Sequence, residues 1–384
     1  MKANTELLSA MNRSAILEFL CTKGPCSRAD ISRELGISFP AVSSNVKALI
    51  AANLAVEIGE GNNALGRKAT LVAFNANWAY LVGVDIGRRH IRTMCADISG
   101  EIKSYHRIRY NKEDIYQAIL DAVQIVVVEA QISMDDVACI GVGIPGIYDE
   151  KRNVHMLAPF IEGWNVSELF PRLKAHYASK QLFFENSVNL GAIGEWWKGC
   201  AHGYDSVVYM EYGVGFGAAI LQNGKILRGA NGAAGEIGYM TVERQTLRDA
   251  FQSEGSLEQI IPSALIDRRI LDSGTENPIQ LNIVLEALKK EMPSEQIEKI
   301  PQYFAMSIIN TVAVINPEIV VISGRLGTAL YQYYQKEIQE LLKAHVPFPP
   351  IVCCSALDEK ANVIGAIELA ERQVVKNNKN IASI

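Results

Sequence analysis

The feature that most constrains the fold is a pattern of strands and turns that occurs twice in the chain. LVGVDIG (81–87) is a buried-strand run that ends in a glycine turn, and IRTMCADISGEI continues it as a hairpin partner. Near residue 207, VVYMEYGVGFGAAILQNGKIL again contains strand, glycine turn, strand and hairpin. Two halves that open alike predict a duplicated α/β domain with a ligand-binding cleft between them. Each glycine turn alone is equally consistent with a tight hairpin that needs positive φ.

The first 75 residues have a different pattern, in which helices are followed by a hairpin. Apolar spacing predicts a helix over Arg13–Thr22. Ser27 and Asp30 form a candidate capping box for a second helix. After a glycine turn, Ser38 can cap a third helix over residues 39–50, with a proline in its first turn, where no amide hydrogen is needed.

Helix, short turn and helix is the helix-turn-helix pattern, and short outward side chains let the third helix enter a major groove about 12 Å wide. LAVEIGEG and GRKATLVAFN predict a hairpin wing whose Arg67 would enter a minor groove. The predicted DNA contacts are Ser38, Phe39, Ala41, Ser43, Ser44, Lys47, Arg67 and Lys68. A trihelical packing module is the alternative, and the GRK segment of the wing favours DNA binding.

Bulk composition is that of a globular chain with more than one domain. The 384 residues carry a formal charge of −5, which gives no overall attraction to DNA or to anionic membranes, and we expect no membrane partner. The N-terminal segment MKANTELLSAMNRS lacks the apolar run of a signal peptide. Seven cysteines without a CxxC spacing predict reduced, buried thiols and a cytoplasmic location.

Several motifs along the chain together resemble the ROK family of repressors and sugar kinases, in the form with an N-terminal winged helix. They are GVDIG, GVGIPG (141–146), APFIEGW, ENSVNLGAIGE, NGKILRGANGAAGEIGYMTV and VVISG. The resemblance implies an α/β fold with two actin-like, hexokinase-like lobes. The expected divisions are a winged helix-turn-helix domain over 1–75, a first lobe over 76–190 and a second lobe over 191–384.

The resemblance also implies a sugar site in the cleft. Glu236 is a single carboxylate in a small, glycine-rich loop, where it can accept hydrogens from sugar hydroxyls or instead cap the turn that follows. The residues expected around the sugar are Gly146, Asn186, Ser187, Glu236, Tyr239 and Glu258. Two of them, Ser187 and Tyr239, replace an Asp and a His of the family, and Phe160 stands where Asn is common. A vestigial cleft without a ligand is the alternative.

Three departures from the family's kinases predict that phosphoryl transfer is lost. Arg88 and Arg89 replace small residues of the first phosphate turn, and Val214 replaces a hydroxyl residue of the second. Ser187 stands in the position of the catalytic Asp, and a serine hydroxyl is no general base near neutral pH without a partner. We therefore expect no enzyme activity and no cofactor.

A structural zinc site is also not expected. The family's GEIGH motif ends here in Tyr239, and the segment that follows, ERQTLRDAFQSEGSLEQI, contains no cysteine. Thiolate and imidazole ligands in tetrahedral spacing are therefore missing.

Together these observations predict a cytoplasmic transcriptional regulator, a repressor of carbohydrate genes that binds an operator as a homodimer or homotetramer and a sugar effector in its cleft. The alternatives are a sugar kinase with an added DNA-binding module and a DNA-binding protein without small-molecule input.

Overall fold

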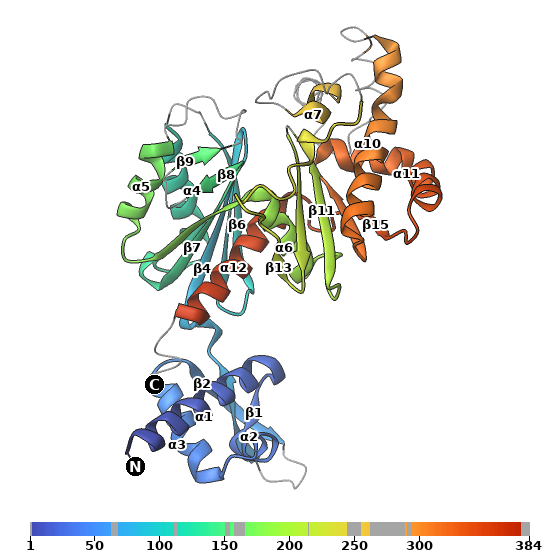
Figure 1. The fold of residues 1–384 in the computed structure, drawn as a ribbon. Coiled ribbons are helices and arrows are strands. Elements are labelled where there is room, and N and C mark those ends of the chain that lie inside the picture. The colour runs from blue at the N-terminus through green and yellow to red at the C-terminus, as the bar shows by residue number, and fades with distance from the viewer. Residues whose placement is uncertain are drawn as a thin grey trace.

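The structure is a computed structural model of the whole chain. It describes residues 2–62, 68–110, 114–149, 154–156, 166–213, 215–243, 255–261, 289 and 293–377. Figure 1 shows a small N-terminal module joined to two larger lobes. No helix among the described residues is long and apolar enough to cross a membrane.

The N-terminal module is a winged helix. Its elements are α1 (Lys2–Lys23), β1 (Cys26–Ser27), α2 (Arg28–Leu35), α3 (Phe39–Ala51), β2 (Ala55–Asn62) and β3 (Lys68–Phe74). The three strands form one antiparallel sheet in the order β1-β3-β2. The predicted helices and hairpin are confirmed, with α1 extending eleven residues before Arg13.

Local hydrogen bonds fix the ends of the module's helices. The predicted capping box of α2 is confirmed, because the Ser27 side chain accepts from the Asp30 amide and the Asp30 side chain accepts from the Ser27 amide. The Ser32 hydroxyl donates to the Ile37 carbonyl at 2.6 Å and so holds the turn between α2 and α3. Ser38 is the N-cap residue of α3, but its side chain makes no capping hydrogen bond, contrary to the prediction.

The two lobes are built on sheets with one shared strand plan. The first lobe contains β4 (Tyr80–Ile86), β5 (His90–Asp97), β6 (Ile102–Arg109), β7 (Val137–Ile144) and β10 (Gln181–Asn186). The second contains β11 (Ser206–Tyr212), β12 (Phe216–Gln222), β13 (Lys225–Ile226), β14 (Ile319–Ser323) and β15 (Ile351–Cys354). The orders are β10-β7-β4-β5-β6 and β13-β12-β11-β14-β15.

In both lobes the first three strands in sequence pair antiparallel and the last two add in parallel beside the first strand. The predicted duplication is therefore confirmed. A small separate hairpin of β8 (Ile147–Asp149) and β9 (Val154–Met156) extends the first lobe.

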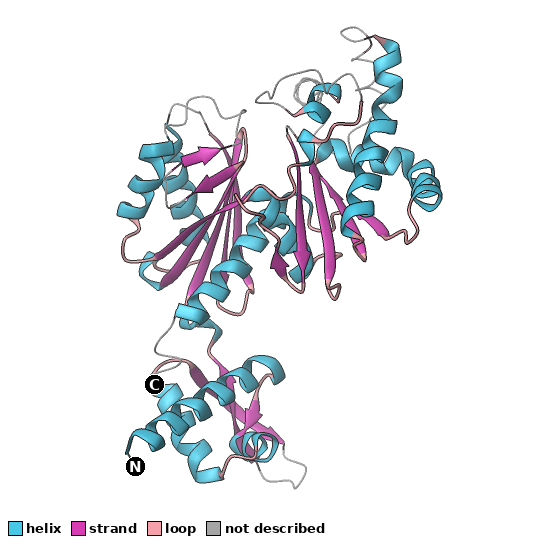
Figure 2. Ribbon diagram, viewed as in Figure 1, coloured by secondary structure: helices cyan, strands magenta, loops and turns pink. Residues whose placement is uncertain are grey.

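Helices cover both faces of each large sheet (Figure 2). The outer faces are covered by α4 (Ile115–Glu129) and α5 (Val166–His176) in the first lobe and by α10 (Ser294–Ile315) and α11 (Arg325–His345) in the second. The remaining helices are α6 (Ser187–Lys198), the short α7 (Ser256–Ile260), α12 (Ala361–Asn377), η1 (Ala76–Trp78), η3 (Met134–Asp136), η4 (Ile237–Tyr239) and η6 (Asp358–Lys360).

The inner helices are exchanged between the lobes. Helix α6 follows the last strand of the first lobe, yet its Ala192 and Ile193 pack on the second sheet. Helix α12 follows the second sheet, yet its Val363 and Ile367 pack on the first. The sequence-based division placed residues 191–384 in one lobe and cut α6 at residue 190, whereas packing places α12 with the first sheet.

The two inner helices cross at glycines. A Cβ atom on Gly365 would lie 1.9 Å from the Leu190 carbonyl oxygen, and one on Gly194 would lie 2.1 Å from the Ala361 carbonyl oxygen. Both neighbours are backbone atoms that cannot rotate away. Only glycine therefore permits this crossing, which is the hinge between the lobes.

The seven cysteines are all free thiols. Only Cys95 and Cys139 are buried, and Cys21 is exposed on α1, so the prediction of buried thiols throughout was wrong. Cys200 and Cys353 lie beside the hinge with their sulfur atoms 3.3 Å apart.

Candidate DNA-binding surface and ligand cleft

The candidate DNA-binding surface is the outward side of α3. Val42, Val46 and Leu49 are buried in the module's core with Ile16 and Leu20 of α1. The opposite side carries residues predicted to contact DNA: Ser38, Phe39, Ser44 and Lys47 are exposed, and Ala41 and Ser43 are half-buried. Phe39 has 51% of its surface exposed although it is aromatic. Lys68 begins β3, and Arg67 lies outside the described residues.

A buried polar contact that the sequence did not reveal fixes α3 against α1. Asn45 is 5% exposed and accepts a hydrogen bond from the Ser9 hydroxyl at 2.8 Å, while its amide donates to the Ala41 carbonyl. Arg13 in turn donates to the Ser9 hydroxyl. Buried polar groups of this kind specify one packing angle, since any other leaves them unpaired.

The winged helix rests on the first lobe. Phe74 and Trp78 pack both against the core of the winged helix and against the cluster formed by α12 and the first sheet. In Figure 1 the lower end of α12 points to this junction. A displacement of α12 relative to the first lobe would therefore disturb the packing of Phe74 and Trp78 that supports the winged helix.

Part of the predicted sugar site gathers at the start of α6. The Asn186 amide nitrogen donates to the Gly146 carbonyl at 2.9 Å, and its oxygen caps α6 by accepting from the amides of Val188 and Asn189. Gly146 has a positive φ of 76°. β10 continues through Asn186 directly into α6.

The second part of the predicted site lies on the second lobe. Burial and the neighbouring Glu258 raise the pKa of Glu236 to about 7. Glu236 makes no side-chain capping hydrogen bond, which argues against the alternative that it caps the turn. Glu258 accepts from the amides of Phe216 and Gly255 at 2.7 and 3.0 Å. Burial, with Glu258 and Glu236 nearby, raises the pKa of the Tyr239 hydroxyl.

Residues of the glycine-rich loop before Glu236 contact the first lobe. Arg228 of the second lobe makes a bidentate ion pair with Glu185 of the first, at 3.0 and 2.5 Å. A Cβ on Gly232 would lie 3.4 Å from the Ile147 side chain of the first lobe. The sequence analysis missed both charged residues, although Glu185 stands beside the predicted sugar residue Asn186 in the chain. Phe160 lies outside the described residues.

Ser187 is engaged in a network around Asp85. Its hydroxyl donates to Asp85 Oδ1 at 2.8 Å, and Asn362 of α12 donates to the same oxygen at 3.2 Å. Arg92 pairs with Asp85 Oδ2 at 3.2 Å and with Glu359 at 3.4 Å. Asp85 is only 3% exposed, and the positive charge of Arg92 compensates its negative charge in place of water. This network connects the first sheet to both inner helices, and the sequence analysis missed it.

Comparison with known families identifies the larger part of the chain. Residues 81–373 match the ROK family, and residues 12–55 match a winged helix-turn-helix DNA-binding family. The chain belongs to the ROK family.

Relatives of similar length carry regulatory names. A xylose repressor of Caldicellulosiruptor bescii is 24% identical, over 95% of this chain and 96% of the relative. The DNA-binding transcriptional dual regulator NagC of Escherichia coli is 25% identical, over 97% and 95%.

Solved ROK structures share the fold. A ROK transcriptional regulator homologous to E. coli MLC aligns with a TM-score of 0.70 at 20% identity, over 98% of this chain and 99% of that one. A ROK hexokinase from Thermus thermophilus aligns with a TM-score of 0.62 at 23% identity, over 78% of this chain and all of its own. The hexokinase alignment covers a smaller share of this chain than that of the regulator.

The described residues of the ROK region, 81–373, do not fit the chemistry of a kinase. A serine hydroxyl can take a proton from a sugar only if a neighbouring base removes its own, and Asp85, which accepts from the Ser187 hydroxyl, is paired with Arg92. The Asp85 carboxylate, beside the first phosphate turn, is occupied by the Arg92 guanidinium. Val214 of the second turn lies outside the described residues. The described residues include no group of three His, Cys, Asp or Glu side chains placed to hold a metal.

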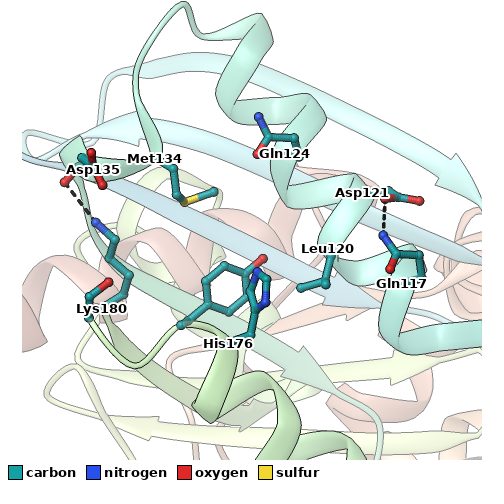
Figure 3. A pocket seen from close by; sticks show the side chains of 10 residues that line it. Gln117, Leu120, Asp121, Gln124, Met134, Asp135, His176 and Lys180 are labelled. Atoms are coloured by element: carbon teal, nitrogen blue, oxygen red, sulfur yellow. Dashed lines mark hydrogen bonds between the residues drawn. The ribbon is translucent and has the colours of Figure 1, made fainter.

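A further pocket of this ROK chain lies away from the cleft (Figure 3). It measures about 360 Å³ and lies between α4, η3 and the segment that follows α5. In Figure 3 Lys180 points to Asp135, whose carbonyl it contacts at 3.0 Å, and Gln117 donates to Asp121. None of the predicted sugar residues lines this pocket.

Proposed function

We propose that the protein is a DNA-binding transcriptional repressor of carbohydrate genes, with α3 in the major groove of a two-fold operator. The observation that carries the proposal is a match over 95% or more of the chain to two regulators. One is named a xylose repressor, and the other is the DNA-binding transcriptional dual regulator NagC. The exposed residues of α3 support it, because small polar side chains and one lysine suit a groove. The protein acts in the cytoplasm as a homodimer or homotetramer.

A sugar is proposed to bind in the cleft. Its hydroxyls would contact Glu236 and Tyr239 from the second lobe and Asn186 and Gly146 from the first, with Ser187 and Glu258 beside them. Glu236 supports this site best, since it is a half-buried carboxylate that makes no ion pair with the described residues. Carboxylates in such a position gain by accepting hydroxyl hydrogens.

The sugar would act by changing the angle between the two lobes. Binding across the cleft favours one arrangement of the lobes, and α12 would transmit it through the Trp78 junction to the winged helix. Such coupling requires that the sugar bind one arrangement more tightly than the other.

The deciding experiment is selection of genomic DNA fragments by the purified full-length protein, at stated near-physiological salt. We expect a few promoters that share a two-fold sequence and lie beside carbohydrate genes. Ser44→Glu on α3 should weaken binding to these promoters at least tenfold, because it places a carboxylate against the phosphates. Ser179→Glu, which makes the same substitution at an exposed position of the first lobe, is the matched control and should bind normally.

Recovery of no fragment above background would overturn the regulator proposal. If operators are recovered, D-xylose and N-acetylglucosamine should be added to the complexes of the protein with these operators, since one of the two sugars is expected to change the affinity for DNA. A lack of ATP turnover with the same sugars is also expected, and measurable turnover would contradict the argument from Ser187.

A further inference from the structure

Two cysteine thiols lie next to each other beside the hinge. Cys200 follows the last residue of α6 by two positions, and Cys353 lies on β15 of the second sheet. Their sulfur atoms are 3.3 Å apart, although 153 positions separate them in the chain. Since the sulfur atoms of a disulfide are about 2.0 Å apart, an approach of about 1.3 Å would allow a bond between them.

The strand also decides which cysteine Cys200 can reach. Side chains alternate between the two faces of a sheet, so the adjacent Cys353 and Cys354 face opposite sides. Cys353 packs together with Cys200 in the cluster between the second sheet and α6. Cys354 packs in the other cluster, on the face covered by α10 and α11. The geometry therefore favours one pair of thiols, Cys200 with Cys353.

A buried carboxylate holds Cys200 in position. Glu195 of α6 is fully buried, and its Oε2 accepts from the Cys200 amide at 2.9 Å and from the Cys200 thiol at 3.2 Å. Its Oε1 accepts from the Ser355 hydroxyl and from the Leu357 amide at 2.8 Å. Glu195 thus connects the end of α6 to the segment between β15 and α12, and it keeps the two thiols adjacent.

The two thiols also differ in acidity. The hydrogen bond with Cys353, burial and the negative charge of Glu195 raise the pKa of the Cys200 thiol. The hydrogen bond with Cys200 lowers the pKa of Cys353, against the opposing effect of burial. Because the thiolate is the form that attacks an oxidant, Cys353 should react first. Both side chains are half-buried, so an oxidant as small as hydrogen peroxide can reach them.

We propose that Cys200 and Cys353 form a reversible disulfide when the protein encounters a peroxide. The Cys353 thiolate attacks one peroxide oxygen, so that an S–O bond forms, the O–O bond breaks and hydroxide leaves with the proton that Cys353 had released. The Cys200 sulfur then attacks the Cys353 sulfur, the S–S bond forms, and the S–O bond breaks. The second hydroxide leaves with the Cys200 proton as water. Two thiols are oxidised by two electrons in total, and one hydrogen peroxide is reduced to two waters.

Oxidation of this pair would act on the hinge. The disulfide would attach the end of α6 to β15, and it would remove the thiol hydrogen bond to Glu195. In a reducing compartment dithiol reductants keep the pair open until the oxidant level rises. A change in operator affinity on oxidation would follow through the lobe angle, and only this last consequence rests on the proposed function.

The test is oxidation of the full-length protein by hydrogen peroxide, without DNA or sugar. Free thiols are counted after unfolding, and linked peptides are identified by mass spectrometry without reduction. We expect two of the seven thiols to be lost together, a peptide linked through Cys200 and Cys353, and recovery of both thiols with dithiothreitol. In Cys200→Ser, the oxidised Cys353 has no second thiol and should proceed to sulfinic acid, which dithiothreitol does not reverse.

Cys354→Ser is the matched control, because it removes the adjacent thiol that faces the other side of the sheet. It should form the linked peptide at the wild-type rate, whereas Cys353→Ser should lose the Cys200 thiol about tenfold more slowly. Circular dichroism should show all variants folded. Absence of the linked peptide in the wild type would overturn the proposal, as would a link to Cys200 that forms at the wild-type rate in Cys353→Ser. Because neither DNA nor sugar is present, a failure here is distinct from a failure of the operator selection.

Discussion

The two lobes share one strand order but hold their cleft carboxylates in opposite ways. In the first lobe Asp85 is neutralised by Arg92, and Glu185 by Arg228. In the second lobe Glu236 makes no ion pair with the described residues, and burial beside Glu258 raises its pKa to about 7. Both carboxylates of the first lobe are therefore compensated by arginines, one of them from the second lobe, whereas Glu236 of the second lobe has no such cation among the described residues.

The largest effect is expected from removing the cation of the first lobe. Arg92→Leu leaves Asp85, 3% exposed, without its positive partner, and should lower the free energy of unfolding by about 3 kcal/mol. Urea denaturation measures this loss. Combining it with Asp85→Asn should restore part of the stability, because the uncompensated charge is gone. A loss below about 1 kcal/mol for Arg92→Leu alone would mean that Asp85 is solvated, and the contrast between the lobes would disappear.

A smaller effect is expected from the ion pair that joins the lobes. Arg228→Met should cost about 1 kcal/mol, since the arginine is half exposed and Glu185 keeps hydrogen bonds from the Asn186 amide and the Asn189 side chain. The same variant should respond to a lower sugar concentration if the pair resists lobe movement. Unchanged sugar response with unchanged stability would show that the pair has no part in the hinge.

The carboxylate of Glu236 in the second lobe should make the free energy of unfolding depend on pH. Since the pKa of Glu236 is raised to about 7, the folded chain holds a proton that the unfolded chain has released. The free energy of unfolding should therefore fall as the pH rises from about 5 to about 8. Glu236→Gln should reduce this fall but not abolish it, because burial raises the pKa of Glu211 and Glu368 to about 7 as well.

Urea denaturation at both ends of that pH range is the measurement. Glu298→Gln, on the exposed side of α10, is the control and should keep the wild-type slope. A slope that stays the same in Glu236→Gln would show that Glu236 is solvated and ionised in the folded chain.

The smallest expected signal is optical. Trp196 packs against Gly224 of the second lobe and Trp197 against Gly100 of the first, so these neighbours straddle the hinge. Sugar binding should change the tryptophan emission slightly, and Trp196→Phe and Trp197→Phe should reveal which side moves. Identical responses in both variants would mean that the lobes close without disturbing the end of α6.

Sequence patterns predicted the parts of the fold that depend on neighbours in the chain. The capping box at Ser27, the winged helix and the glycine-turned hairpins all follow from residues a few positions apart. The destination of α12 could not be predicted, because its apolar stripe shows that one side is buried but not which sheet it covers.

The candidate site likewise has a part that could be predicted from the sequence and a part that could not. Asn186 and Gly146 were predicted from motifs, and the structure joins them by a hydrogen bond. The partners of Asp85 could not be predicted, since Ser187 and Asn362 lie 102 and 277 residues from it in the chain. Arg92 stands seven residues from Asp85, on the next strand, and hairpin pairing was the one signal that could have revealed it.

The exchange of the inner helices has a consequence for synthesis of the chain. The first sheet emerges from the ribosome early, but α12, which covers one of its faces, is made only after the whole second sheet. The platform under Phe74 and Trp78 is therefore incomplete until the second sheet has been synthesised. A chain that stops short of residue 361 would carry a finished winged helix on an unfinished support, and its exposed apolar face would mark it for chaperones and proteases.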